Sequence, residues 1–440
     1  MASRTEPLLP ATAADDASDP SSPSCGRIVA LCVSLVATTV GAGVLSVPIS
    51  IAYIGSMPYG CAMLAFFGVL STASLLFIDN AADRMNAGSY LALGERCFGR
   101  AGASAVLWSL LGLLGGAFVQ LSIIVIDLTE MLLANTVYAS TDATPNRLVV
   151  TLVVLVLAYP LCLPRQLLQL SFTSSLSVGC ILFTCFCIVS LSLDAGESEL
   201  LSESSSTSGA PNAHTSGAAW PLAMPIFSLA FCSQFQILEI SHSLPRASRA
   251  RHLPRITLIA MGCAFVIYAL VGTVCYSMLR DKALRYPNVL TAFGDVPLVA
   301  CGSLAIAVVN FLKLPLVLLP LRALLLEHFE VKPTPTGAAH AALTFVMVSV
   351  LGLLAMLAGN LAFAFQVAGS TAGVSVCFCL PGLLYWKASR VTSAADKLIG
   401  QTGAAVALRS GILEEAAGAI MAAMGLVSGL LCLWALFIAS

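Results

Sequence analysis

The sequence predicts an all-α polytopic membrane protein, and three observations support that fold class. Of its 440 residues, 58% are hydrophobic and only 10% are charged, whereas soluble domains carry about 25% charged residues. Apolar runs of about 20 residues, the length that crosses a bilayer as a helix, recur along the whole chain. Lys and Arg residues also fall mainly in alternate loops between these runs.

Eleven apolar runs are predicted to span the bilayer, so we expect about eleven transmembrane helices. Residues 1–24 are rich in Ser, Pro, Ala and Asp and predict a disordered cytosolic tail, which leaves residues 25–440 as the transmembrane domain. The expected spans are 27–54, 58–80, 103–134, 147–164, 170–193, 220–243, 256–279, 296–326, 338–358, 360–386 and 412–438. The third and eighth are long enough to require tilt or a portion outside the hydrocarbon.

Charge predicts the orientation of these spans. With the N-terminus in the cytosol, sixteen of the 21 Lys and Arg residues lie in inner loops and ends, four lie outside, and Lys313 lies within the membrane. This bias follows the positive-inside rule and places the C-terminus outside the cell or in a lumen. Ten or twelve spans would break the bias. The sequence does not decide between the plasma membrane and a vacuolar or lysosomal type of membrane.

Composition excludes several other classes of protein. The formal net charge of −1 offers no basic surface for nucleic acid. Most of the 15 cysteines lie in apolar runs, without a C-x-x-C pair or a Cys/His cluster at metal-binding spacing, so we expect no metal site and no cofactor. A membrane enzyme would need a cluster of His, Asp or Glu at mid-depth, and the five His residues are mostly in loops. We therefore expect no enzyme, and the oligomeric state stays open.

The first apolar run contains an interruption at Gly41, Gly43 and Pro48. Each Gly weakens a helix by about 1 kcal/mol relative to Ala, and Pro removes a backbone donor. Irregular backbone inside a membrane is tolerated only where protein or a water-filled cavity satisfies it. A broken helix of this kind aims N–H groups at a substrate carboxylate in many transporters. Alternatively, the small residues let two helices pack closely.

The sixth run is interrupted as well. Pro221 and Pro225 precede a small polar cluster of Cys232, Ser233 and Gln234 at mid-depth. If the chain is built from two inverted halves of five segments, the first and sixth runs occupy corresponding positions. That coincidence favours a transporter. The alternative is that Ser233 and Gln234 merely bond a neighbouring helix.

Several stretches resemble the amino acid/auxin permease family, in the branch that includes the sodium-coupled neutral amino acid transporters. They are Gly41–Pro48, Phe227–Phe231 with Gln234, Ser243–Ser248, Asn288–Leu290, Leu314–Arg322, Ala368–Thr371 and Pro381–Tyr385. The stretches occur in the family's order over about residues 27 to 386. The resemblance implies a LeuT-type fold of two inverted five-helix repeats plus one extra helix. It also implies transport of an amino acid coupled to Na⁺ or H⁺.

The resemblance further implies where the substrate would bind. Its carboxylate would meet N–H groups between Gly41 and Gly43, and its amino group would meet carbonyls around Thr38 and Phe231. The substrate-binding residues would be Thr38, Thr39, Gly41, Ala42, Gly43, Phe231, Cys232, Ser233 and Gln234. No acidic residue stands beside either interruption in the sequence, so a neutral amino acid fits better than a cationic one.

The ion site implied by the resemblance lies between the first interruption and the eighth helix. There the sequence places Lys313 near a position where a hydroxyl residue often helps to bind Na⁺, and we assign ion coupling to Lys313, Asn310 and Thr38. Our hypothesis is that the Lys313 ammonium replaces Na⁺, which makes transport Na⁺-independent and coupled to H⁺. Alternatively, Lys313 extends to the cytosolic interface or pairs with a carboxylate.

Together these observations predict a secondary active transporter of neutral amino acids. It would work by alternating access, with H⁺ favoured over Na⁺ as the coupling ion. Its partners would be the substrate and the lipid bilayer. The alternative is a non-transporting amino-acid sensor of the same fold, which binds its ligand and signals through a cytosolic segment.

Overall fold

The computed structural model describes residues 24–138, 145–164, 170–194, 219–293, 296–329, 337–399 and 404–439. Residues 1–23 of the predicted tail lie outside the described residues, as do residues 195–218. Every regular element in the described ranges is helical, which confirms the predicted all-α fold class.

The first five predicted segments coincide with helices in chain order. The interrupted first segment comprises α1, the 3₁₀ helix η1 and α2. Each of the next four coincides with one helix, except that α4 is kinked into two helices at Gly99, which has φ 63° and ψ −149°. Their bounds are α1 Cys25–Thr39, η1 Ala42–Leu45, α2 Val47–Ile54, α3 Met57–Met85, α4 Tyr90–Thr136, α5 Arg147–Cys162 and α6 Leu170–Asp194.

The second set of five repeats this plan and is followed by one additional helix. Its first segment is again a series of short helices. The bounds are η3 Trp220–Leu222, α8 Met224–Ala230, η4 Gln234–Gln236, α9 Ile237–Ser243, α10 Arg246–Leu279, η5 Arg280–Arg285, η6 Val289–Phe293, α11 Pro297–His328, α12 Gly337–Ala358, α13 Leu361–Ala368, α14 Leu380–Ile399 and α15 Ala404–Ala439. The third long segment of each half, α4 and α11, therefore occupies the same place in the plan.

Eight helical segments in the described part of the chain are long and apolar enough to cross a membrane, with Trp220–Ser243 counted as one of them. Three shorter apolar helices, Cys25–Thr39, Arg147–Cys162 and Leu176–Leu191, fall below that length. The predicted segments thus coincide with helices, while the number of eleven crossings stays a prediction.

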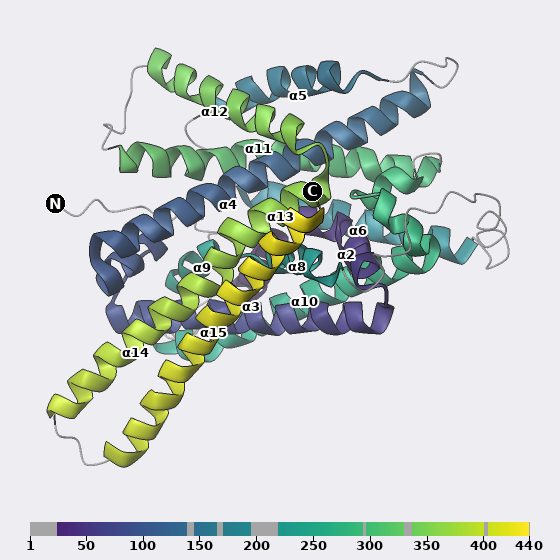
Figure 1. The fold of residues 1–440 in the computed structure, drawn as a ribbon. Coiled ribbons are helices and arrows are strands. Elements are labelled where there is room, and N and C mark those ends of the chain that lie inside the picture. Colours follow the sequence, from purple (N-terminus) through teal and green to yellow (C-terminus); the bar gives the residue numbers. More distant parts are fainter. Residues whose placement is uncertain are drawn as a thin grey trace.

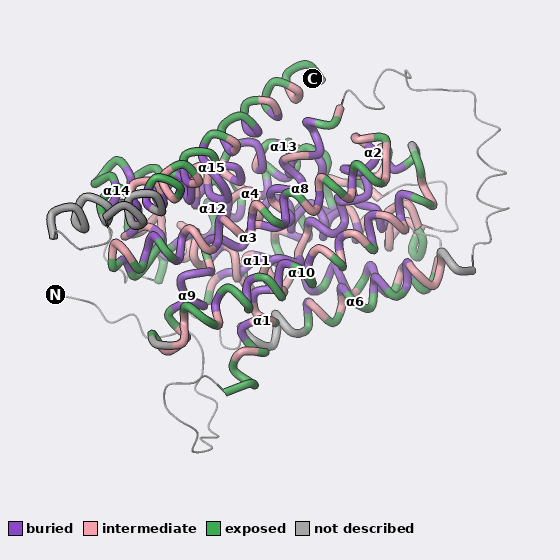
Figure 2. Tube along the Cα trace, turned by 90° about the horizontal axis from the view of Figure 1, so that it is seen from below, coloured by how far each residue is buried: buried purple, intermediate pink, exposed green. Residues whose placement is uncertain are grey.

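The two halves interlock around a buried centre. Helices α4 and α11 run side by side across the middle of the molecule, with α5 and α12 on one flank and α3 and α10 on the other (Figure 1). Helices α14 and α15 form a hairpin that packs on α3 and projects beyond the rest (Figure 1). Buried residues concentrate in the short helix α8 and the inner faces of its neighbours (Figure 2).

The outer helices expose large apolar side chains. Phe345 and Leu357 on α12 and Trp434 and Phe437 on α15 are all exposed, and Phe437 retains 82% of its accessible surface. Surfaces of this kind are expected where a protein faces lipid hydrocarbon instead of water. The exposed faces of α12 and α15 therefore agree with the predicted membrane domain.

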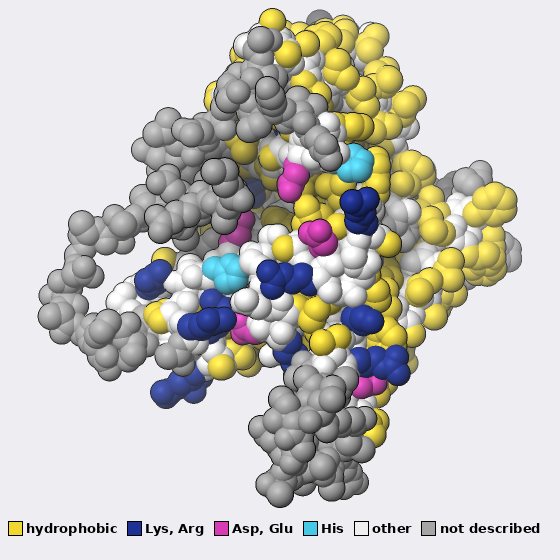
Figure 3. All heavy atoms as spheres, turned by 90° about the vertical axis from the view of Figure 1, so that its left-hand side faces the viewer, with side chains coloured by type: hydrophobic (Ala, Val, Ile, Leu, Met, Phe, Trp, Pro, Cys, Tyr) yellow, Lys and Arg dark blue, Asp and Glu magenta, His cyan; other side chains and the backbone are white. Residues whose placement is uncertain are grey.

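Lys and Arg side chains gather at the end of the molecule that faces the viewer in Figure 3. The first turns of α4 and α10 carry the exposed residues Arg96, Arg100, Arg246, Arg251 and Arg255. This one-sided distribution agrees with a single cytosolic face. That this basic face is the cytosolic one stays a prediction.

Several helices extend further than the hydropathy pattern predicts. Helices α4, α10 and α15 begin at Tyr90, Arg246 and Ala404 instead of residues 103, 256 and 412, and α14 continues to Ile399 instead of residue 386. The extensions of α10 and α14 are rich in Arg, Lys, Ala and Ser. Hydropathy detects burial in lipid and not helix formation, and Ala, Arg and Lys favour helices outside the bilayer as well.

The tenth segment contains an irregularity that the sequence did not predict. Between α13 and α14, residues Gly369–Gly373 and Ser375–Cys379 form π-helical turns. Gly369 lies so close to α8 that a Cβ atom there would stand 2.6 Å from the Pro225 carbonyl oxygen. A wide turn with glycine at the contact thus lets the backbone of this segment approach α8.

Candidate functional site

The first helix is interrupted where the sequence predicts. Helix α1 ends at Thr39, and Gly41 adopts φ −129° and ψ −136° before η1 begins. Helix α2 then starts at Val47 with Pro48 in its first turn, where the missing N–H of proline costs no hydrogen bond. No described residue accepts a hydrogen bond from the N–H of Ala42 or Gly43. We call residues Val40–Gly43 break 1.

The sixth segment is interrupted between α8 and η4, and we call residues Phe231–Ser233 break 2. Its backbone is paired by side chains from other helices. Ser71 on α3 donates to the Phe231 carbonyl at 2.7 Å, and the Ser233 N–H donates to Gln234 Oε1 at 3.0 Å. Gln234 Nε2 donates to Ser71 Oγ at 2.9 Å, and Cys377 Sγ lies 3.3 Å from Gln234 Oε1. Gln234 therefore organises break 2 and does more than bond a neighbouring helix.

The two breaks meet at Tyr268 on α10. Its hydroxyl oxygen lies 2.7 Å from the Thr39 carbonyl oxygen at the end of α1 and 2.7 Å from the Ala230 carbonyl oxygen at the end of α8. The Tyr268 ring is fully buried and meets the Phe231 ring edge to face, with centroids 5.3 Å apart. A Cβ atom on Gly43 would stand 3.0 Å from Ala230 Cα, so glycine permits this close contact.

A second connection joins the breaks one turn away. The Thr38 hydroxyl forms a hydrogen bond with Gln236 Oε1 in η4 and lies 3.0 Å from the Ser34 carbonyl oxygen. Thr38 thus belongs to the contact between the two interrupted segments and does not line the cavity described next.

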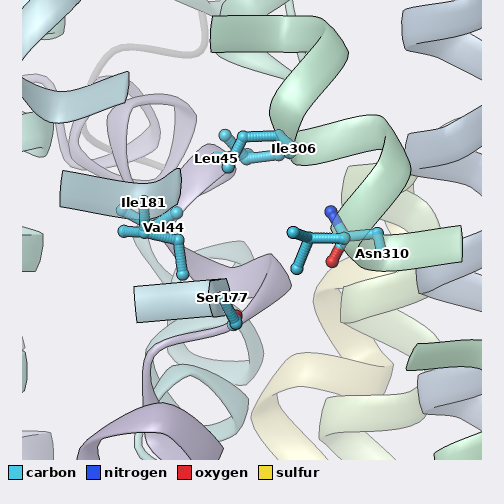
Figure 4. A pocket seen from close by; sticks show the side chains of 8 residues that line it. Val44, Leu45, Ser177, Ile181, Ile306 and Asn310 are labelled. Atoms are coloured by element: carbon cyan, nitrogen blue, oxygen red, sulfur yellow. The ribbon is translucent and has the colours of Figure 1, made fainter. Parts of the chain in front are cut away.

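A small cavity lies beside break 1 (Figure 4). Break 1 contributes Gly41 and η1 contributes two apolar side chains, while α6 and α11 close the other sides. The lining residues are Gly41, Val44, Leu45, Ser177, Ile181, Ile306, Val309 and Asn310. The cavity volume is about 10 Å³. This is room for about one water molecule or a bare ion and not for an amino acid.

The cavity lining is apolar except at three points. These are the Gly41 backbone, the Asn310 amide on α11 and the Ser177 hydroxyl on α6. Asn310 and Ser177 can be seen on two sides of the space in Figure 4. Ser177 Oγ is buried and has no hydrogen-bond partner among the described residues. A buried hydroxyl without a partner is costly, so this cavity favours a polar or charged occupant.

The other predicted ion-coupling residue lies further along α11. Lys313 follows Asn310 by three residues and interacts electrostatically with Cys180 on α6. It is half-buried and does not line the cavity. Lys313 forms no ion pair with any described residue. The ion pairs within the described ranges are formed by Arg84, Arg147, Arg249 and Arg390.

The structure brings the predicted substrate residues together. Thr38 and Thr39 stand at the end of α1, Gly41, Ala42 and Gly43 belong to break 1, and Phe231, Cys232, Ser233 and Gln234 form or follow break 2. Asn310 joins them at the cavity, whereas Lys313 lies one turn away. Among the described residues, none that lines the cavity or bonds to either break is acidic.

Sequence reasoning missed five polar or weakly polar residues that complete this site. They are Ser71, Ser177, Gln236, Tyr268 and Cys377. A serine or cysteine in an apolar helix is usually a small buried residue without a functional role. The one available signal was a tyrosine in the middle of an apolar span, since a buried phenol needs a hydrogen-bond partner.

Comparisons with known proteins agree with this arrangement. A family model described as "Transmembrane amino acid transporter protein" matches residues 27–436. Solute carrier family 38 member 10 of Mus musculus is 24% identical over 385 residues, which are 84% of this chain and 34% of that protein. The Homo sapiens protein of the same name is 24% identical over 373 residues, or 81% of this chain and 32% of its own. The chain spans about a third of the length of these curated relatives.

Two solved transporters share the fold. A Na⁺-coupled sialic acid symporter in its substrate-bound, outward-open state gives a TM-score of 0.50 at 12% identity, over 92% of this chain and 90% of that one. Mhp1, a nucleobase-cation-symport-1 family transporter in a closed conformation, gives 0.50 at 15% identity, over 93% and 92%. These similarities confirm the predicted LeuT-type fold.

Proposed function

Because the chain belongs to the transmembrane amino acid transporter family, we propose that it is a secondary active transporter of neutral amino acids that works by alternating access. The observation that carries this proposal is the meeting of two interrupted helices, one from each half, at a shared point in the buried centre. Interrupted helices in corresponding positions are where transporters of this architecture bind their substrates.

The chemistry of the breaks supports a zwitterionic substrate without a charged side chain. The N–H groups of Ala42 and Gly43 lack acceptors among the described residues, so they are available to a carboxylate. The Thr39 carbonyl at the end of α1 and the Ala230 carbonyl at the end of α8 share one donor, the Tyr268 hydroxyl, which an ammonium group could replace. A cationic side chain would need a carboxylate partner, and no acidic residue lines the cavity or bonds to the breaks.

Ion coupling belongs to the α6–α11 side of break 1. The cavity offers Ser177, Asn310 and the Gly41 backbone to a small ion, and Lys313 places an ammonium one helical turn away. Lysines in apolar surroundings can exchange a proton at physiological pH, and intramembrane charge is usually functional. We favour H⁺ as the coupling ion, carried by Lys313, over Na⁺ in the cavity.

The orientation follows from the basic face. With the Arg-rich starts of α4 and α10 in the cytosol, the N-terminus is cytosolic and the C-terminus is extracellular or luminal. Modification of single introduced cysteines by a membrane-impermeant reagent tests this. Labelling of a cysteine near Arg251 from outside intact cells would contradict it.

Uptake into proteoliposomes of the purified protein tests the proposed function. Labelled L-alanine, L-glutamine and L-leucine are supplied separately, and a Na⁺ gradient and a pH gradient are imposed in separate experiments. Uptake driven by the pH gradient alone supports transport and H⁺ coupling together. Uptake driven only by Na⁺ retains the transporter and contradicts H⁺ coupling. Saturable binding without uptake under either gradient would favour the sensor.

Lys313→Thr tests the coupling group. We expect uptake driven by a pH gradient to fall about tenfold or more, because the proton carrier is removed while the cavity lining is unchanged. Lys387→Thr is the matched control, since Lys387 on α14 lies over the Phe98 ring, away from both breaks. Its uptake should stay within about twofold of wild type. If Lys313→Thr leaves both the ion dependence and the pH dependence unchanged, Lys313 is not the coupling group.

A further inference from the structure

Tyr268 contacts both breaks through one atom. Its hydroxyl oxygen stands 2.7 Å from two carbonyl oxygens, those of Thr39 and Ala230, and also interacts with the Gly41 N–H. A phenol carries a single hydrogen, so it donates to one of these carbonyls at a time. The other carbonyl then faces an oxygen lone pair in a fully buried site. The junction therefore has one hydrogen fewer than its acceptors require.

The acceptors at this junction are of the kind that a substrate ammonium would use, and this step rests on the proposed function. The neighbouring Phe231 carbonyl is already paired with Ser71. The Thr39 and Ala230 carbonyls, in contrast, share the single hydroxyl hydrogen of Tyr268. An ammonium group has three hydrogens and could bond both carbonyls at once, which the Tyr268 hydroxyl cannot do.

We propose that the Tyr268 hydroxyl is a built-in substitute for the substrate ammonium, which holds break 1 to break 2 while the site is empty and yields at least one carbonyl when substrate binds. Tyr268 is thereby a positioning residue for the empty carrier. The loaded carrier has the ammonium at the junction and depends less on the hydroxyl. The reorientation of the empty carrier and that of the loaded carrier should consequently respond differently to its loss.

Tyr268→Phe separates these two steps, because it removes the hydroxyl and keeps the buried ring. Net uptake requires the empty carrier to return, whereas exchange of external labelled for internal unlabelled amino acid cycles only through loaded states. We expect net uptake to fall about tenfold, since two buried carbonyls lose their donor in the empty carrier. Exchange should stay within about twofold, and the half-saturation concentration should fall about threefold because the empty state is destabilised relative to the bound one.

The control variant is Tyr90→Phe, which removes another buried tyrosine hydroxyl. Tyr90 donates to the Val376 carbonyl at 3.2 Å and makes no bond to either break. Any loss it causes should affect net uptake and exchange in equal proportion. Both variants are measured with the amino acid among L-alanine, L-glutamine and L-leucine that the wild-type protein carries.

Three results would overturn the proposal. In Tyr268→Phe, an equal but partial fall of net uptake and exchange would show a structural role, and a raised half-saturation concentration would show a direct substrate contact. If Tyr268→Phe shows neither net uptake nor exchange, substrate affinity is measured instead by the thermal stabilisation that substrate gives the purified variant. Binding tighter than wild type supports the proposal, and weaker or absent binding overturns it. Failure of the proposed function is distinguishable, because the wild-type protein would then show neither uptake nor exchange.

Discussion

The two breaks are alike in sequence position and unlike in how their polar groups are satisfied. At break 2, Ser71 pairs the Phe231 carbonyl and the Gln234 side chain pairs the Ser233 N–H. At break 1, the N–H groups of Ala42 and Gly43 have no acceptor in the described part of the chain, and a cavity adjoins Gly41. Side chains of the protein satisfy backbone groups of break 2, whereas two backbone N–H groups of break 1 have no acceptor among the described residues.

This difference assigns distinct roles to the two breaks. A buried polar group without a partner costs about 1–3 kcal/mol, so a protein retains it only where something else supplies the bond. We therefore propose that ligand and ion bind on the break 1 side of the site. Gln234 holds break 2 in place through its hydrogen bonds, and break 1 packs next to it. The unpartnered hydroxyls of Ser228 and Ser233 beside break 2 are the exception to this division.

Gly43→Val should produce the largest effect, because it separates the breaks. Even one Cβ atom at this position would stand 3.0 Å from Ala230 Cα, and two further methyl groups would cost about 3 kcal/mol in strain. We expect uptake to fall about 100-fold. Gly41→Ala should leave the thermal midpoint of the purified protein unchanged, since nothing lies within 4 Å of a Cβ atom there. Wild-type uptake in Gly43→Val would show that the breaks do not meet as described.

Gln234→Leu should have the next largest effect, and it acts on stability first. The substitution leaves the Ser233 N–H without its acceptor in a fully buried site and costs about 2 kcal/mol. Thermal unfolding in detergent measures the loss. Cys377→Ser keeps a donor beside Gln234 Oε1 and should shift stability by less than about 1 kcal/mol. Equal losses in the two variants would mean that Gln234 does not organise break 2.

Ser177→Ala should have the smallest effect on stability and a clear effect on coupling. Its hydroxyl has no partner among the described residues, so removal should change the free energy of unfolding by less than about 0.5 kcal/mol. The H⁺ concentration for half-maximal uptake should nevertheless rise, because the cavity one helical turn from Lys313 loses a polar group. Ser303→Ala removes another hydroxyl that has no partner among the described residues and does not line the cavity, and it should alter neither quantity. An unchanged ion dependence in Ser177→Ala would contradict a role of the cavity in ion coupling.

Sequence alone predicted break 1 because its cause is local: Gly41, Gly43 and Pro48 disfavour a continuous helix whatever surrounds them. At the sixth segment, Pro221 and Pro225 lie in the first turns of η3 and α8. The polar cluster that follows α8 marks the position of break 2 in the sequence. The order of helical segments could be predicted for a similar reason, since bilayer thickness fixes their length. The start of α10 could not, because its first ten residues form a helix outside the apolar run.

The residues that complete the site could not be predicted, because their roles depend on distant packing. Tyr268 meets Thr39 and Ala230 only after three helices from both halves assemble. Ser177 resembles many serines in apolar helices, and only the absence of a partner beside a cavity distinguishes it. Lys313 was conspicuous in the sequence, yet the structure places it one turn from the cavity and so leaves its role to experiment.

Hydrogen–deuterium exchange of the purified protein, with and without the neutral amino acid that it carries, tests the division between the breaks most directly. In the empty protein, amides of residues 41–43 should exchange faster than those of residues 231–233, because only the latter region is paired by side chains. Substrate should then protect residues 41–43 strongly and residues 231–233 little. Equal exchange at both breaks in the empty protein, or protection confined to residues 231–233, would contradict the account.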